Sequence, residues 1–145
     1  IGVTEELSAQ AIYELGKDIE PFVIASGTRM GHVHLSVKNS SESSAFYQEA
    51  LRLEDKFTIP HASWIASGAY HHHLAVNEWG GKNLVRRKNG MVGLAYYVVE
   101  VENKEELLKV FAQSQGNEVI IQWLSSAEFS ITDSDGIVTR VRVGN

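Results

Sequence analysis

The chain contains no cysteine, only two prolines, and no apolar run long enough to cross a bilayer as a helix. The absence of cysteine excludes disulfides and thiol catalysis and is compatible with a reducing compartment. The net charge is −5, and the single basic run, Arg86–Lys88, is interpreted as a solvated turn. We therefore expect a cytoplasmic protein with neither a nucleic-acid nor a membrane partner.

The first 28 residues carry a helical pattern. Leu7, Ile12, Leu15 and Ile19 recur at largely helical spacings. We interpret residues 1–28 as a leader or interdomain linker helix. The chain starts at isoleucine rather than methionine, which leaves open an upstream segment.

Short alternating segments begin at residue 30. Residues 30–37 (MGHVHLSV) alternate between apolar and polar side chains, as expected for a half-buried strand. The amphipathic segment 40–53 predicts a helix that begins at an N-cap serine. Turn signals then separate three predicted strands, at 56–59, 62–66 and 70–76. His61, which follows Pro60, is interpreted as a loop residue.

The same order returns after a predicted loop at 77–92. A strand at 93–101 precedes a helix that begins at the N-cap Asn103 and stops at Gly116. Three more strands are predicted at 118–124, 128–133 and 137–143. Strand, helix and three strands thus occur twice, at 29–82 and 91–145. We predict an α+β fold of two βαβββ repeats that form a cup-shaped curved sheet.

Three segments carry a family resemblance: GTRMGHVHLSV, FYQEALRL and SGAYHHHLAVNEWGG. They resemble the vicinal oxygen chelate superfamily, which contains glyoxalases, bleomycin- and fosfomycin-resistance proteins and extradiol dioxygenases. The resemblance is nearest to the C-terminal half of bacterial catechol-2,3-dioxygenase-like proteins. It covers residues 29–143 and implies one such domain at 29–145. It also implies two possible kinds of partner, an N-terminal sister domain and a second copy of the chain.

The resemblance also locates a metal site. Extradiol enzymes hold Fe(II) with two histidines and one glutamate that project into the cup. The corresponding positions fall on His32, Tyr96 and Arg140. Arginine offers no lone pair and stays charged, so we do not expect a standard extradiol iron site. Fe(II) or another divalent transition metal stays open as a cofactor, with His32 as a ligand.

Three consecutive histidines, His71, His72 and His73, lie in the strand predicted at 70–76. Alternation along that strand would separate His72 from its two neighbours. The resemblance gives His72 the part of an acid–base catalyst in the cup, a part that suits an imidazole near neutral pH. The alternative is that these rings only stack or bond to the backbone, which we favour for His71 and His73.

Three functions remain open. The first is a metal-degenerate C-terminal domain whose residual pocket is made of His32, His34, His72, Tyr96 and Arg140. In that pocket Arg140 would recognise a small anionic molecule. The second is a metal-dependent, ring-cleaving dioxygenase or glyoxalase-type lyase that uses His32 and His72 with an unrecognised third ligand. Separately, His32, His34 and His72 could converge on zinc or another transition metal. The third is a metal-free module that binds a small aromatic or anionic molecule.

Overall fold

The computed structural model describes residues 6–18, 23–81, 83–88, 90–116 and 119–144, in two compact units, Ile1–Met30 and Gly31–Asn145. The first unit contains helix α1 (Ala9–Gly16), whose N-cap Ser8 accepts a hydrogen bond from the N–H of Ala11. The predicted helical residue Ile19 lies outside the described residues. Within the described residues, no helix has the length and apolar content that a bilayer crossing requires.

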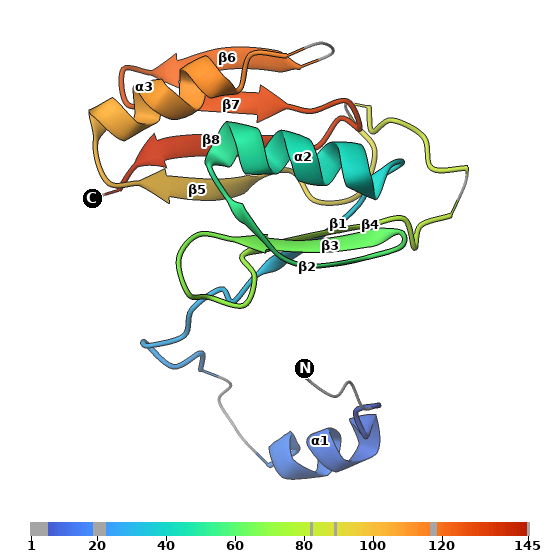
Figure 1. Cartoon of the computed structure of the whole chain (residues 1–145). Helices are drawn as coiled ribbons and strands as arrows, with labels where there is room; N and C mark the ends of the chain where they lie inside the picture. The colour runs from blue at the N-terminus through green and yellow to red at the C-terminus, as the bar shows by residue number, and fades with distance from the viewer. Residues whose placement is uncertain (1–5, 19–22, 82, 89, 117–118, 145) are drawn as a thin grey trace. The chain divides into compact units, whose positions relative to one another are not determined.

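The second unit contains two modules of the same order (Figure 1). The first module consists of β1 (Val33–Ser36), α2 (Ser40–Leu51), β2 (Glu54–Ile59), β3 (Ala62–Ala66) and β4 (Leu74–Asn77). The second consists of β5 (Tyr97–Val101), α3 (Lys104–Gln113), β6 (Ile120–Ser125), β7 (Glu128–Thr132) and β8 (Val138–Val143). The predicted α+β fold of two βαβββ modules is therefore confirmed.

Each module forms one four-stranded mixed sheet. The strand orders are β1-β4-β3-β2 and β5-β8-β7-β6, and the first strand of each module pairs in parallel with the last. The outer strands β2 and β6 each carry an irregularity in register, between Asp55 and Phe57 and between Trp123 and Ser125. The two sheets thus share their strand order, and each outer strand has a bulge, near the start of β2 and near the end of β6.

Helices α2 and α3 contact each other, and each packs against the sheet of its own module. Alternation along the strands sends one set of side chains toward the helices and the other set away from them. The buried side chains of both modules form one cluster: Leu35, Val37, Tyr47, Ala50, Leu51, Ile65, Leu74, Val76, Tyr97, Leu107, Val110, Phe129, Ile131 and Val141. One core therefore supports both sheets.

The helix starts follow from side-chain capping. Asn103 caps α3 as predicted, because its side chain accepts a hydrogen bond from the N–H of Glu106. The prediction of a serine as the N-cap of α2 is wrong, since Asn39 caps the helix by accepting from the N–H groups of Ser41 and Glu42. Asparagine is as good a cap as serine, and Ser40 is left free to bond elsewhere.

Three predicted strands begin three or four residues later in the structure. β1 begins at Val33 rather than at residue 30. β4 begins at Leu74 rather than at residue 70, because the backbone bends at His71 and His73. β5 begins at Tyr97 rather than at residue 93. The predicted first residue of the strand at 118–124 lies outside the described residues. Because β4 begins only after His73, the histidine triplet does not follow strand alternation.

A buried hydrogen bond joins the two modules. The hydroxyl of Tyr47, which is 1% exposed, donates to Oδ2 of Asp133 at 2.6 Å. Oδ1 of Asp133 accepts from the N–H groups of Asp135 and Ile137 at 3.0 and 2.8 Å. Oδ2 of Asp135 in turn accepts from the N–H of Lys38 at 3.3 Å. Burial raises the pKa of both Tyr47 and Asp133, so this pair depends on its hydrogen bonds.

We expect Tyr47→Phe to lower the free energy of unfolding by about 1–3 kcal/mol, because it leaves a buried carboxylate oxygen without its donor. Urea unfolding at neutral pH measures the change. Tyr13→Phe is the matched control, since Tyr13 is 64% exposed on α1. Equal stability of the two variants would show that the hydroxyl contributes nothing.

Candidate functional site

Four histidines from two segments of the first module gather at one end of its sheet. Ring nitrogens of His32, His71 and His72 all lie within 4.8 Å of one another. Nε2 of His34 lies 3.2 Å from Nε2 of His72. His72 is buried, whereas His32 and His71 are exposed. The group of possible metal ligands in the described part of the chain consists of imidazoles alone.

Parallel pairing of β1 with β4 explains this cluster. Val33 is paired with Leu74, and the N–H of Val33 donates to the carbonyl of His73 at 3.0 Å. The residues that precede both strands therefore lie side by side at the same end of the sheet. His32 meets the histidine triplet for this reason.

The prediction that His71 points away from His72 is wrong. The rings of these neighbours lie 4.4 Å apart between centroids, because the bends on either side of His72 replace strand alternation. His73 is placed differently. Its Nδ1 accepts from the N–H of Ser67 at 3.3 Å, and its ring lies 4.9 Å from that of Tyr70. The triplet thus contributes two members to the cluster and one to the adjacent loop.

Burial and the neighbouring histidines keep the rings of His72 and His34 neutral. Burial, followed by the nearby charges of His32, His71, His34 and His73, lowers the pKa of His72 to about 4. Burial and the charge of His32 also lower the pKa of His34. Each ring therefore has a lone pair available at neutral pH, for a metal or for a proton.

The other two predicted site residues pair with each other in the second module. The guanidinium carbon of Arg140 lies 3.8 Å from the centre of the Tyr96 ring. A nitrogen of the same guanidinium lies 3.8 Å from Oε1 of Glu128. A cation–π pair at these two positions does not provide metal ligands. The side chains present at the three expected positions do not fit the extradiol iron site.

Of the predicted pocket residues, His34 lines a cavity of about 250 Å³ beside the loop at 84–94. The cavity walls are largely apolar and also include Arg87 and Asp135. The interpretation of Arg86–Lys88 as a solvated turn is wrong for Arg87. The side-chain Nε of Arg87 is buried and has no hydrogen-bond partner among the described residues. Its backbone N–H donates to the carbonyl of Asp135 at 2.8 Å. Only the fold could reveal this contact, which joins distant parts of the sequence.

In metal-free protein we expect the His72 ring to stay neutral down to about pH 5, as seen in its NMR resonances. The unfolded chain takes up this proton near pH 6.5, so the free energy of unfolding should fall as the pH drops from 6.5 toward 4. His72→Gln should remove that part of the pH dependence in urea unfolding. Titration of the folded-state ring near pH 6.5 would contradict the prediction.

Comparisons with known proteins agree with the fold and the sequence pattern. No family model matches the chain. The chain is 30% identical over 106 residues to catechol-2,3-dioxygenase of Bacillus subtilis. That match covers 72% of this chain and spans 37% of the relative's length.

Several solved structures share the fold. A glyoxylase/bleomycin resistance protein/dioxygenase domain from Frankia sp. EAN1pec has a TM-score of 0.63 at 17% identity, covering 83% of this chain and 100% of that one. Lactoylglutathione lyase from Agrobacterium tumefaciens has a TM-score of 0.59 at 16% identity, over 83% and 96%. A mutant fosfomycin resistance protein from Listeria monocytogenes, complexed with Mn(II) and a dihydroxypropylphosphonic acid, has a TM-score of 0.60 at 13% identity, over 84% and 93%. The chain belongs to the glyoxalase/bleomycin resistance/dioxygenase superfamily, the vicinal oxygen chelate group.

Proposed function

We propose that the chain is the C-terminal half of a two-domain protein similar to catechol-2,3-dioxygenase, and that this half has lost the extradiol iron centre. The observation that carries the proposal is the environment of Arg140. The resemblance assigns Arg140 to the position of the acidic ligand, and its guanidinium pairs with Tyr96 and Glu128. The match to a relative of which the chain spans 37% supports the view that a sister domain completes the protein.

The physical argument concerns charge. A metal dication at the expected position would meet a fixed positive charge in place of a carboxylate, and like charges at short range repel strongly in a partly buried site. An arginine in the cup instead suits a carboxylate or phosphate. We therefore propose that this half binds a small anionic molecule while the sister domain holds the metal.

The isolated chain should bind no stoichiometric iron after anaerobic incubation with Fe(II), and it should not consume oxygen with catechol. The double variant Tyr96→His/Arg140→Glu should gain iron affinity, because it restores two ligand types. Arg142→Glu is the control, since Arg142 pairs with Glu100 outside the predicted site. Tightly bound iron with ring cleavage by the unaltered chain would overturn the proposal. Peptide mapping of the natural protein should also find peptides that precede Ile1.

The imidazole cluster favours a second candidate function, a metal-dependent lyase or dioxygenase built on different ligands. His32, His71 and His72 would hold the ion, because their ring nitrogens lie within 4.8 Å of one another. Three histidines with one open position form a recognised set for catalytic zinc. When bound, such an ion supplies Lewis-acid polarisation of an oxygen ligand. His34, 3.2 Å from the His72 ring, would accept or donate a proton beside it.

Titration with Co(II), followed by visible absorption, should give one site per chain. His32→Ala and His71→Ala should each weaken binding by roughly tenfold or more, as loss of ligand-shell groups does in metal sites. His61→Ala and His73→Ala are controls, since both residues lie outside the group. Unchanged affinity in His32→Ala would exclude the cluster as the site. Failure of the parent chain to bind Co(II) would favour the metal-free module, for which a rise in Tm with small anionic ligands is the test.

A further inference from the structure

A second cleft lies away from the histidine cluster, between α2 and the β2–β3 hairpin. Its volume is about 470 Å³, within the range of small-molecule sites. Ser63 lies in its wall and is paired with Val76, which belongs to the core under the helices. The cleft therefore opens on the helix-facing side of the sheet, whereas His34 alternates with the core residue Leu35 and faces the other side.

His61 stands at the hairpin turn beside this cleft in an unusual conformation. Its φ is 68°, in the left-handed region that non-glycine residues seldom adopt, although histidine is among the types that tolerate it. Such a conformation persists only where the surroundings hold it. The surroundings here are supplied by Glu78, whose N–H donates to the carbonyl of His61 at 3.0 Å.

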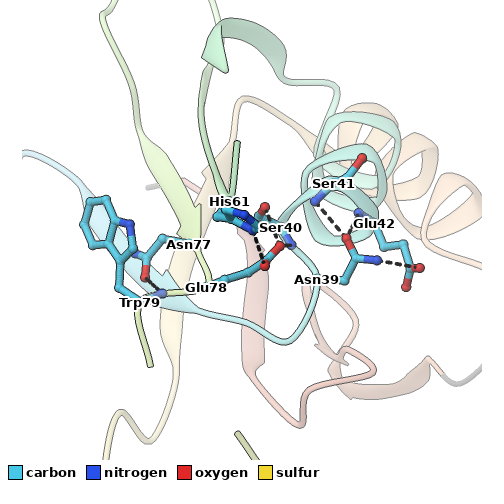
Figure 2. Close-up of polar contacts among 8 residues, drawn as sticks. All are labelled: Asn39, Ser40, Ser41, Glu42, His61, Asn77, Glu78 and Trp79. Carbon is cyan, nitrogen blue, oxygen red and sulfur yellow. Dashed lines mark hydrogen bonds and ion pairs between the residues drawn. The ribbon is translucent and has the colours of Figure 1, made fainter. Parts of the chain in front are cut away.

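Glu78 also orients the imidazole, as Figure 2 shows. Its Oε2 lies 2.7 Å from Nδ1 of His61. Its Oε1 accepts from both the N–H and the hydroxyl of Ser40, each at 2.9 Å. The hydrogen bond from the Ser40 N–H is the main cause that lowers the pKa of Glu78 to about 2. The carboxylate is thus fixed and charged, and Nε2 of His61 has no partner among the described residues.

Hydroxyl groups form the rest of the polar wall. Ser44 and Ser63, both buried, lie 2.7 Å apart between hydroxyl oxygens. The hydroxyl oxygens of Thr58 and Ser63 lie 2.9 Å apart, and the Gln48 amide donates to Ser44 at 2.9 Å. A hydroxyl can donate once and accept twice, so this row of hydroxyl groups retains hydrogen-bonding capacity toward a ligand.

The charges around the cleft select the class of ligand. No lysine or arginine is among its described lining residues, which disfavours phosphates and carboxylates. The two carboxylates already accept hydrogen bonds, Glu78 from Ser40 and Asp55 from Thr58, so neither requires a cation. Ile59 and Pro60 add apolar surface. We propose that the cleft is a binding site for a neutral polyhydroxylated molecule of sugar size, with His61 as its oriented hydrogen-bonding group.

NMR titration of the full chain with glucose and with myo-inositol tests the proposal. Saturable shifts are expected in amides of residues 40–48 and 58–63. His61→Asn should weaken binding by roughly tenfold, because it removes the imidazole while asparagine still tolerates the left-handed turn. Absence of a saturable shift from both probes would reduce the cleft to a hydrated groove and overturn the proposal.

A second pair of variants keeps the test independent of the turn. Ala45→Phe should abolish the shifts by filling the cleft, whereas Glu49→Phe, at an exposed position on α2 outside the lining, should leave them unchanged. Equal binding by both variants would overturn the assignment of the site. Glucose 6-phosphate and ethanolamine are the charged probes, and tighter binding of either than of glucose would refute the neutral class.

Discussion

The buried hydrogen bond between Tyr47 and Asp133 connects a helix of the first module to the turn between the last two strands of the second. The same carboxylate also closes that turn through two N–H groups. Gly136 completes the arrangement with a φ of 82°, and a Cβ there would lie 2.5 Å from the carbonyl oxygen of Arg87. One small polar centre around Asp133 therefore determines three features: the chain reversal between β7 and β8, the docking of the two modules, and the course of the loop before β5. Strand β8, which carries Arg140, emerges directly from it.

Most of the fold could be predicted from local patterns. The repeated order of strand, helix and three strands is visible because alternating apolar residues and helix caps such as Asn103 act over a few residues. The pairing of β1 with β4 is parallel and distant in sequence, so no local pattern reveals that His32 meets His71. Strand alternation does not apply at His72, because bends at His71 and His73 precede the start of β4 at Leu74 and composition does not reveal them. His61 lies in the turn between β2 and β3, as predicted, but no local pattern reveals its partner Glu78, which follows β4.

The fold of the superfamily is present, whereas the set of side chains at the three expected ligand positions differs from that of the extradiol iron site. The resemblance assigns one ligand position to His32, directly before β1, and the other two to Tyr96 and Arg140, which stack on each other in the second module. The histidines that crowd around His32 all come from the first module. The candidate metal ligands among the described residues thus lie at one end of a single sheet. The lowered pKa of His72 follows first from burial and then from this crowding by other histidines.

The bulges in β2 and β6 have a consequence for the behaviour of the chain at high concentration. Both strands are sheet edges, whose unpaired backbone groups invite pairing with another chain. A bulge twists an edge away from such pairing, and both edges have one. β2 adds the charges of Glu54, Asp55 and Lys56, whereas β6 reads IIQWLS and carries none. Protection of these two edges against fibril-like pairing therefore relies on charge and shape in β2 and on shape alone in β6.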